Sequence, residues 1–132
     1  MQYASWIQRV GAYLVSALAL AAIQGLGLGA SLLLGERNWL TGVLLAGAFV
    51  FWIADRWVFS GRTGQTLGRR VLGIRMVDAG NGEPIGVWLA FVRDMWHVLD
   101  AVPCYLGFFA PLWDAERQTF ADRIVKTVVV KT

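Results

Sequence analysis

The chain has 132 residues, of which 57% are hydrophobic and 16% are charged, and its formal net charge at pH 7 is +3. Because soluble domains usually contain about 25% charged residues, this composition argues against an ordinary soluble domain and predicts an integral membrane protein. The single cysteine excludes an internal disulfide and a cysteine-rich metal site built by this chain alone. We therefore expect no cofactor.

The first predicted transmembrane helix covers residues 10–34, which carry no charge. At about 1.5 Å per residue this run exceeds a hydrocarbon layer of roughly 30 Å. A cleaved signal peptide is the alternative, since Arg9 precedes the run and Ala21 ends a small-residue pattern typical of cleavage sites. Gly25 and Gly29 form a G-x-x-x-G pattern, which permits close packing of a neighbouring helix in lipid, although glycine is also common in such helices generally.

The second predicted transmembrane helix covers residues 39–57 and begins and ends with tryptophan, a residue that concentrates at membrane interfaces. The short polar link before it predicts an antiparallel hairpin. Arg9 and Asp55 would then lie at the same end of the hairpin and could form an ion pair. Equally, Arg9 could anchor to lipid phosphate while Asp55 pairs with neighbouring Arg56.

Residues 58–86 form the predicted loop after the hairpin, and arginines gather there. By the positive-inside rule this loop and the N-terminus face the cytoplasm, which predicts a multi-pass protein of a bacterial inner (cytoplasmic) membrane. Residues 71–77 read as a strand and 79–82 as a turn, so we predict a small β-hairpin within the loop. The β-branched run 127–130 is a second candidate partner for that strand.

The glycines of residues 61–70 superficially resemble a phosphate-binding loop, but the Gly-Lys-Ser/Thr ending is absent. We predict instead that Arg69, Arg70 and Arg75 contact anionic lipid headgroups, which makes the bilayer a partner. Nucleic acid is not expected as a partner, because the basic residues cluster beside an apolar segment rather than along a stripe interleaved with aromatic residues.

The third apolar segment covers residues 87–113 and has the pattern of an amphipathic helix. Its first half carries Arg93, Asp94, His97 and Asp100, and ionisable groups are costly at the centre of a bilayer. A proline then interrupts the helix. We predict two full spans plus an amphipathic or re-entrant helix pair, with three full spans as the alternative.

Two pairs within this segment have both a functional and a structural interpretation. His97, with Asp100 one helical turn away, could relay protons or sense pH, or it could simply be hydrogen-bonded at an interface. Arg93 and Asp94 could form a charged pair, as a structural anchor more often than as part of an ion path. The predicted charge network comprises Arg9, Asp55, Arg93, Asp94, His97, Asp100 and Asp122.

Residues 114–132 are predicted to be a cytoplasmic tail with a strand. The complete prediction is one mainly α membrane domain, residues 1–132, made of a transmembrane helical hairpin, an amphipathic or re-entrant helix pair and a small cytoplasmic β element.

Several motifs together resemble the RDD family of membrane proteins, named for one arginine and two aspartates; they are Arg9–Tyr13, Gly64–Asp78, Arg93 and Thr119–Val130. The resemblance implies that Arg9 is the family arginine and that Asp122 is the later aspartate. The acid expected seven residues after the arginine is Ser16 here. A hydroxyl can keep a hydrogen bond but carries no charge, which weakens any ion-coupled role inferred from the family. The resemblance implies no established reaction.

Motifs typical of enzymes, such as Gly-x-Ser-x-Gly, a P-loop or a metal-spaced histidine or cysteine cluster, do not occur in the sequence. We therefore expect a protein that is not an enzyme, most simply an accessory or structural subunit of a membrane assembly. The alternative is a transport-related protein for an unknown solute or ion. It would have to act as a homo-oligomer, because two helices cannot enclose a pore.

Overall fold

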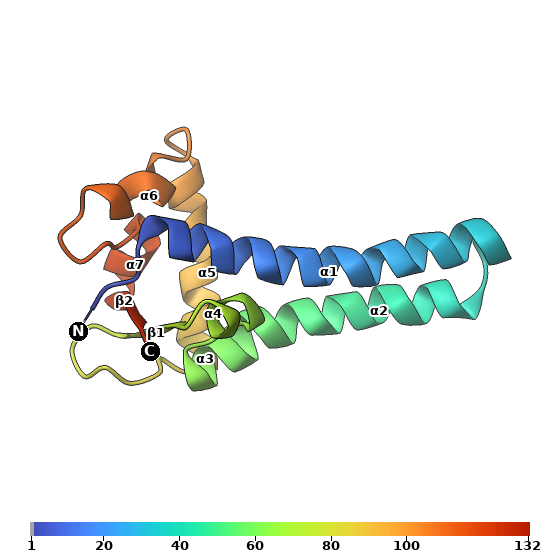
Figure 1. The fold of residues 1–132 in the computed structure, drawn as a ribbon, viewed down its shortest axis with the longest axis horizontal. Helices are drawn as coiled ribbons and strands as arrows, with labels where there is room; N and C mark the ends of the chain where they lie inside the picture. Colours follow the sequence, from blue (N-terminus) through green and yellow to red (C-terminus); the bar gives the residue numbers. More distant parts are fainter. Residues whose placement is uncertain (1) are drawn as a thin grey trace.

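The computed structural model describes residues 2–132 and shows a long helical hairpin with a head of short elements at one end (Figure 1). The hairpin consists of α1 (Trp6–Leu34) and α2 (Trp39–Ile53). Beyond α2 the helix continues through a π-helical segment, η1 (Ala54–Phe59), into α3 (Ser60–Thr63). The runs Trp6–Leu34 and Trp39–Thr63 are long and apolar enough to cross a membrane.

Side-chain caps set where the two long helices begin. The Ser5 hydroxyl accepts a hydrogen bond from the Gln8 backbone N–H at 3.2 Å, and the Gln8 side chain accepts one from the Ser5 N–H at 3.0 Å. This reciprocal capping box starts α1 at Trp6, before the predicted start at residue 10. Asn38 caps α2 by accepting from the Thr41 N–H at 2.8 Å.

The two helices pack together through small residues. A Cβ added at Gly27 would lie 3.3 Å from the Leu45 side chain, so the absence of a side chain there lets the helices approach. Gly25 and Gly29, in contrast, have open space on their Cβ side. Only Ala12 and Gly27 of α1 are buried. A core helix of a soluble protein would be covered on more sides, so these exposed apolar faces suit lipid.

The third apolar segment breaks into short pieces. They are α5 (Val87–Ala101), α6 (Leu106–Phe109), the 3₁₀ turn η2 (Ala110–Leu112) and α7 (Phe120–Ile124). Helix α5 lies across the base of the hairpin rather than alongside it (Figure 1). Its 15 residues extend about 22 Å, short of a hydrocarbon layer of roughly 30 Å. This segment is therefore not a third candidate span, and its depth in a bilayer stays a prediction.

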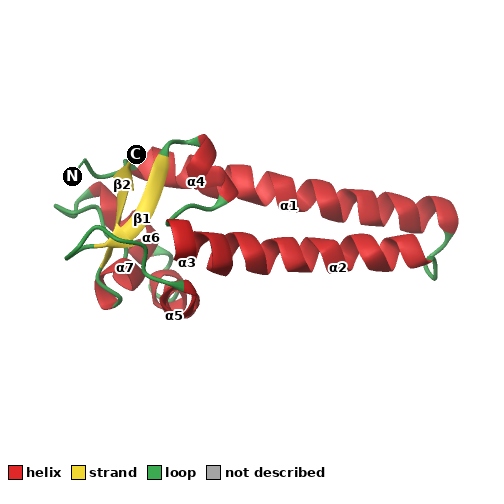
Figure 2. Ribbon diagram, turned by 90° about the horizontal axis from the view of Figure 1, so that it is seen from below, coloured by secondary structure: helices red, strands yellow, loops and turns green. Residues whose placement is uncertain are grey.

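The small sheet is antiparallel and joins distant parts of the chain. Strand β1 (Ile74–Asp78) pairs with β2 (Thr127–Lys131), so that Met76 lies opposite Val129 (Figure 2). The hairpin predicted within residues 58–86 is wrong, and the alternative partner at 127–130 is confirmed. A turn does follow β1, but Pro84 lacks the N–H that a returning strand would donate.

The N-terminal segment lies beside the same sheet. The Ala4 N–H donates to the Val129 carbonyl at 2.8 Å, and the Lys131 N–H donates to the Gln2 carbonyl at 2.9 Å. Both ends of the described chain therefore lie at the head (Figure 1). The main core cluster of the head consists of Ala4, Ala12, Ile74, Met76, Ala90 and Val129.

Two glycines bring the backbone of the head onto the hairpin. Gly64 ends α3 with φ +76°, a left-handed conformation that glycine adopts without strain. Thr66 then caps the short helix α4 (Leu67–Val71). A Cβ at Gly68 would lie 1.6 Å from the Ala12 carbonyl oxygen, so α4 rests directly on the α1 backbone.

Candidate functional site: a charged cavity at the base of the hairpin

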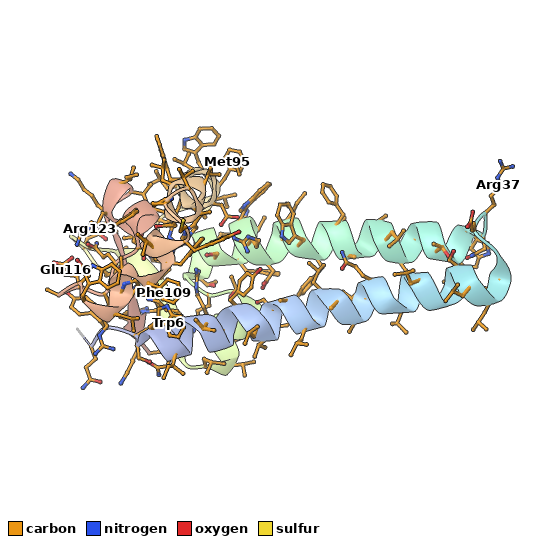
Figure 3. The ribbon with its side chains drawn as sticks, turned by 90° about the horizontal axis from the view of Figure 1, so that it is seen from above. Trp6, Arg37, Met95, Phe109, Glu116 and Arg123 are labelled. Carbon is orange, nitrogen blue, oxygen red and sulfur yellow. The ribbon has the colours of Figure 1, made fainter. Side chains whose placement is uncertain are left out.

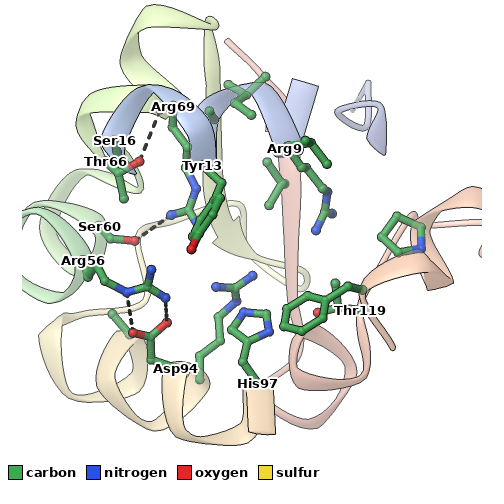
Figure 4. Close-up of a pocket in the computed structure, with 18 of the residues that line it drawn as sticks. Arg9, Tyr13, Ser16, Arg56, Ser60, Thr66, Arg69, Asp94, His97 and Thr119 are labelled. Atoms are coloured by element: carbon green, nitrogen blue, oxygen red, sulfur yellow. Dashed lines mark hydrogen bonds and ion pairs between the residues drawn. The ribbon is translucent and has the colours of Figure 1, made fainter. Parts of the chain in front are cut away.

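A cavity of about 550 Å³ lies where the hairpin meets the head (Figure 4). Its polar lining includes side chains from α1, η1, α3, α4 and α5, and its aromatic lining includes residues in and near α6. The charged side chains that line it are Arg9, Asp55, Arg56, Arg69, Arg93 and Asp94. At the opposite tip of the hairpin Arg37 stands far from this cluster (Figure 3). The charged residues of the chain therefore concentrate at one end of an otherwise apolar molecule.

Asp122 lies behind the cavity and is fully buried. Its carboxylate accepts from Arg9 Nη1 at 2.6 Å and from Arg93 Nε at 2.6 Å. The backbone N–H of Thr119 donates to it as well, at 3.1 Å, within a capping box that starts α7. Burial alone would raise the pKa of Asp122, but Arg93 and Arg9 outweigh burial and hold that pKa far below its usual range. The carboxylate therefore stays ionised.

The predicted ion pair between Arg9 and Asp55 is wrong, because Arg9 bonds Asp122 instead. Two helical turns separate Arg9 from Ser16, and it is Ser16 that lies opposite Asp55. The start of α1 reaches beyond the hairpin into the head, where α7 supplies the partner carboxylate.

Asp55 joins three elements. Its carboxylate accepts from the Ser16 hydroxyl at 2.9 Å and from the Leu67 backbone N–H at 2.5 Å. The Ser16 oxygen in turn accepts from the Gly68 N–H at 3.0 Å. Ser16 and Asp55 thus satisfy the first N–H groups of α4 and fix that helix to both arms of the hairpin.

Arg56 and Asp94 form a bidentate ion pair, at 2.7 and 2.5 Å. Trp57 Nε1 adds a bond to the same carboxylate at 3.1 Å. Burial is the largest single influence and would raise the pKa of Asp94, but the bond and the charge of Arg56, together with the Trp57 bond, lower that pKa overall. The predicted pairing of Asp94 with Arg93 is wrong, since consecutive residues of a helix point in different directions.

His97 and Asp100 contact each other as the sequence suggested. His97 Nδ1 lies 2.6 Å from Asp100 Oδ2. Asp100 is completely buried and also accepts from the Phe120 N–H at 2.7 Å, at the start of α7. The Asp100 carboxylate therefore connects His97 of α5 to the start of α7.

The prediction that Arg69 faces outward toward lipid headgroups is wrong. Its guanidinium lines the cavity and donates from Nη1 to the Ser60 hydroxyl at 2.7 Å (Figure 4). Burial, reinforced by the positive charge of Arg93, lowers the pKa of Arg69 to about 9. Arg70 and Arg75 are exposed, so their contact with headgroups stays a prediction.

The structure brings the whole predicted charge network together around this cavity. Arg9, Asp55, Arg93, Asp94 and His97 line it, whereas Asp100 and Asp122 lie immediately behind. Sequence reasoning missed the inward direction of Arg69, the role of Ser60 and the π-helix η1. Among the described residues 2–132 no group of three or more His, Cys, Asp or Glu side chains could hold a metal ion.

The model of the RDD family matches residues 3–126. The chain belongs to the RDD family. RDD proteins are membrane-associated, in agreement with the two apolar helices. No solved structure matches this RDD protein.

Curated relatives give this RDD protein no reaction. The proline-rich antigen of Mycobacterium leprae (strain TN) is 30% identical over 151 residues, which cover 96% of this chain and 60% of the relative. The proline-rich antigen homolog of Mycobacterium tuberculosis (strain ATCC 25618 / H37Rv) is 39% identical over 88 residues, 67% of this chain and 37% of the relative. The chain therefore spans less than two thirds of the length of either relative.

The RDD arginine and later aspartate, as the resemblance assigned them, are the bonded pair Arg9 and Asp122. Ser16, which stands where the resemblance implies an acid, contacts Asp55. An aspartate at position 16 would place a second negative charge beside Asp55. Serine instead donates a hydrogen bond from α1 to Asp55 of η1 without adding a charge.

We expect the stability of the protein to fall as the pH drops from 7.5 to 5.5. Burial, with the positive charge of Arg93, holds the pKa of His97 below its usual 6.5 despite the Asp100 bond, which acts in the opposite direction. The unfolded chain then binds the proton more readily than the folded chain, so stability is lost as the pH falls below 6.5. Thermal unfolding in detergent across this range measures the effect.

His97→Gln should flatten that pH dependence. Carboxylates contribute little to the slope in this window, because their usual pKa values lie near 4. Equal slopes for the variant and the wild type would contradict the assignment of the effect to His97.

Proposed function

We propose that this RDD protein is an accessory or structural subunit of a membrane assembly and that it is not an enzyme. The observation that carries the proposal is the division of the chain into an apolar hairpin and a charged head that is bonded within itself. The buried carboxylates Asp55, Asp100 and Asp122 all accept hydrogen bonds from the head or its junction with the hairpin. The hairpin, in contrast, offers its outer faces to lipid and to other helices.

One face of α1 is suited to a partner helix. At about 100° per residue, Gly25 lies roughly 200° around the helix from Gly27, which contacts α2. Gly25 and Gly29 therefore face away from α2, and exposed Leu32 lies on the same side. Small residues on an open helix face allow close packing in lipid.

We also propose a multi-pass orientation in a bacterial inner membrane with the head in the cytoplasm. The support is the concentration of arginines in the head, against Arg37 alone in the turn at the other tip. Both termini would then be cytoplasmic, since both lie at the head. Exposed Arg70 and Arg75 would meet anionic headgroups, where each basic residue contributes roughly 1 kcal/mol.

A transport-related homo-oligomer is the second candidate, and the cavity favours it because it could hold a solute. The described hairpin has no ionisable side chain between Ser16 and the turn at 35–38, nor between that turn and Asp55. A path across the membrane would therefore have to form between copies of the chain.

Cysteine crosslinking in native membranes tests both candidates. In a Cys104→Ser background, which removes the exposed native thiol, we expect Leu32→Cys labelled with benzophenone maleimide to crosslink on illumination to a second, different subunit, because the excited benzophenone inserts into nearby C–H bonds. Leu26→Cys is the matched control, since Leu26 is also exposed but lies about 80° from the centre of the face with Gly25 and Gly29.

The mass of the crosslinked product separates the outcomes. A defined foreign subunit supports the accessory role, and a dimer of this chain supports the transport-related oligomer. Equal or absent crosslinking at the two positions would contradict any use of this face.

A further inference from the structure

Arg69 differs from the other arginines that line the cavity. Within the described residues 2–132, the other three each bond a carboxylate, whereas Arg69 takes part in no ion pair. Its side-chain partner is the neutral hydroxyl of Ser60. A guanidinium has five N–H donors in a planar fork, so Arg69 keeps most of its donors and its full positive charge for another acceptor.

Arg9 approaches the same space from α1 and is also incompletely bonded. Its Nη1 donates to Asp122, but its Nε and Nη2 are buried and have no acceptor among the described residues. Protein atoms cover both nitrogens, so a small rotation of the guanidinium about its Asp122 contact is needed to bring them to a ligand. Unsatisfied buried donors of a charged group are costly, which favours any acceptor that satisfies them.

The carboxylates near the cavity are already bonded elsewhere. Asp94 holds Arg56, and Asp55 accepts from Ser16 and the α4 backbone. Asp122 is shared between two arginines. Arg69 is therefore the cavity arginine that no carboxylate pairs with. Arg9 and Arg93 share a single carboxylate, so they add further positive charge to the site.

We propose that this cavity binds the phosphate group of a small organic ligand, with Arg69 as the principal contact and Arg9 and Arg93 beside it. Arg9 of α1 and Arg69 of α4 enter the space from different sides (Figure 4), and Arg93 of α5 also lines it. A tetrahedral phosphate offers acceptor oxygens toward several directions at once, whereas a carboxylate offers only two oxygens in one plane.

The remaining lining suits the organic part of such a ligand. A cavity of about 550 Å³ is much larger than a phosphate ion and lies within the usual range for small-molecule sites. Trp6, Tyr105 and Phe108 supply apolar surface within it. The ligand is a phosphate monoester from solution or the headgroup of a phospholipid, since both present the same phosphate chemistry.

Two binding measurements on the full chain separate these sources. The first is calorimetric titration with inorganic phosphate in a maltoside detergent at constant ionic strength, with chloride as the reference anion. The second is native mass spectrometry of the protein from phosphatidylcholine nanodiscs with and without phosphatidic acid. We expect specific binding in at least one arm, and the arm that shows it identifies the source.

Arg69→Gln is the decisive variant, because it removes the charge without breaking an ion pair. We expect it to weaken the binding seen in the wild type at least tenfold. Arg117→Gln is the matched control: it removes the same charge from an exposed residue of the head that does not line the cavity, and it should change binding less than twofold. An equal effect of the two substitutions would overturn the proposal, as would the absence of specific binding in both arms.

If Arg69→Gln fails to fold, Arg69→Lys provides the second variant. It keeps the positive charge but replaces the planar fork with a single ammonium group, and we expect at least a threefold loss of binding. Unchanged binding in a folded Arg69→Lys protein, together with an unfolded Arg69→Gln protein, would assign Arg69 a structural role and overturn the proposal. These outcomes are independent of whether the hairpin crosslinks to a partner.

Discussion

Asp122→Asn should destabilise the protein more than any other conservative substitution in the head. The change keeps the shape of the side chain but leaves Arg9 and Arg93 buried without their shared carboxylate. Breaking a buried ion pair in this way costs about 3–5 kcal/mol, a large share of the stability of a domain of this size. We expect a fall in the thermal unfolding temperature in detergent, or loss of folded protein during purification.

The control for this substitution is Glu116→Gln, which removes one negative charge from an exposed residue. It should leave the unfolding temperature nearly unchanged. The double substitution of Arg9 and Asp122 by alanine should cost less than the sum of the two single substitutions, because residues in direct contact are not independent. Strictly additive losses would show that the Arg9 bond contributes nothing to stability.

Gly68→Ala should separate α4 from α1. The added methyl group would lie 1.6 Å from the Ala12 carbonyl oxygen, and the obstacle is backbone rather than a flexible side chain. Overpacking of this kind typically costs about 1–3 kcal/mol, and we expect the upper part of that range. The hydrogen bond from the Gly68 N–H to Ser16 would be lost as well. Thermal unfolding of the variant in detergent measures the loss.

Gly47→Ala is the matched control, because the same methyl group at Gly47 meets nothing within 4 Å. Alanine favours helix over glycine by up to about 1 kcal/mol, so this variant should be as stable as the wild type or slightly more stable. Equal losses at Gly47 and Gly68 would mean that the close approach of α4 to α1 is not what the glycine permits.

The sequence predicted the hairpin because its signal is local. Long uncharged runs with a polar turn between them need no knowledge of the rest of the chain. The same holds for the amphipathic character of α5 and for the contact of His97 with Asp100, which one helical turn brings together.

The partners of the charged residues could not be predicted in this way. The Arg9 side chain meets Asp122 across 113 positions of sequence, and only the fold of the head decides this over Asp55. Arg69 and Arg70 are adjacent in a helix of five residues, too short for periodicity to show which one faces inward. The π-helix η1 has no composition of its own, yet it carries both Asp55 and Arg56 to the site. One signal was available: an arginine inside an apolar run, as Arg56 is inside Trp39–Thr63, is expensive without a partner.

The pairing of β2 with β1 and with the N-terminal segment dictates an order of assembly. Strand β2, the partner of β1 and of the N-terminal segment, is synthesised well after the hairpin, as is Asp122. The two apolar helices can enter the membrane and associate as soon as they emerge, in keeping with independent insertion followed by packing. Arg9 must wait until its carboxylate partner, 113 positions later in the chain, has been made. The head therefore closes only after Asp122 and β2 have been synthesised, so the hairpin can pack before the charged site exists.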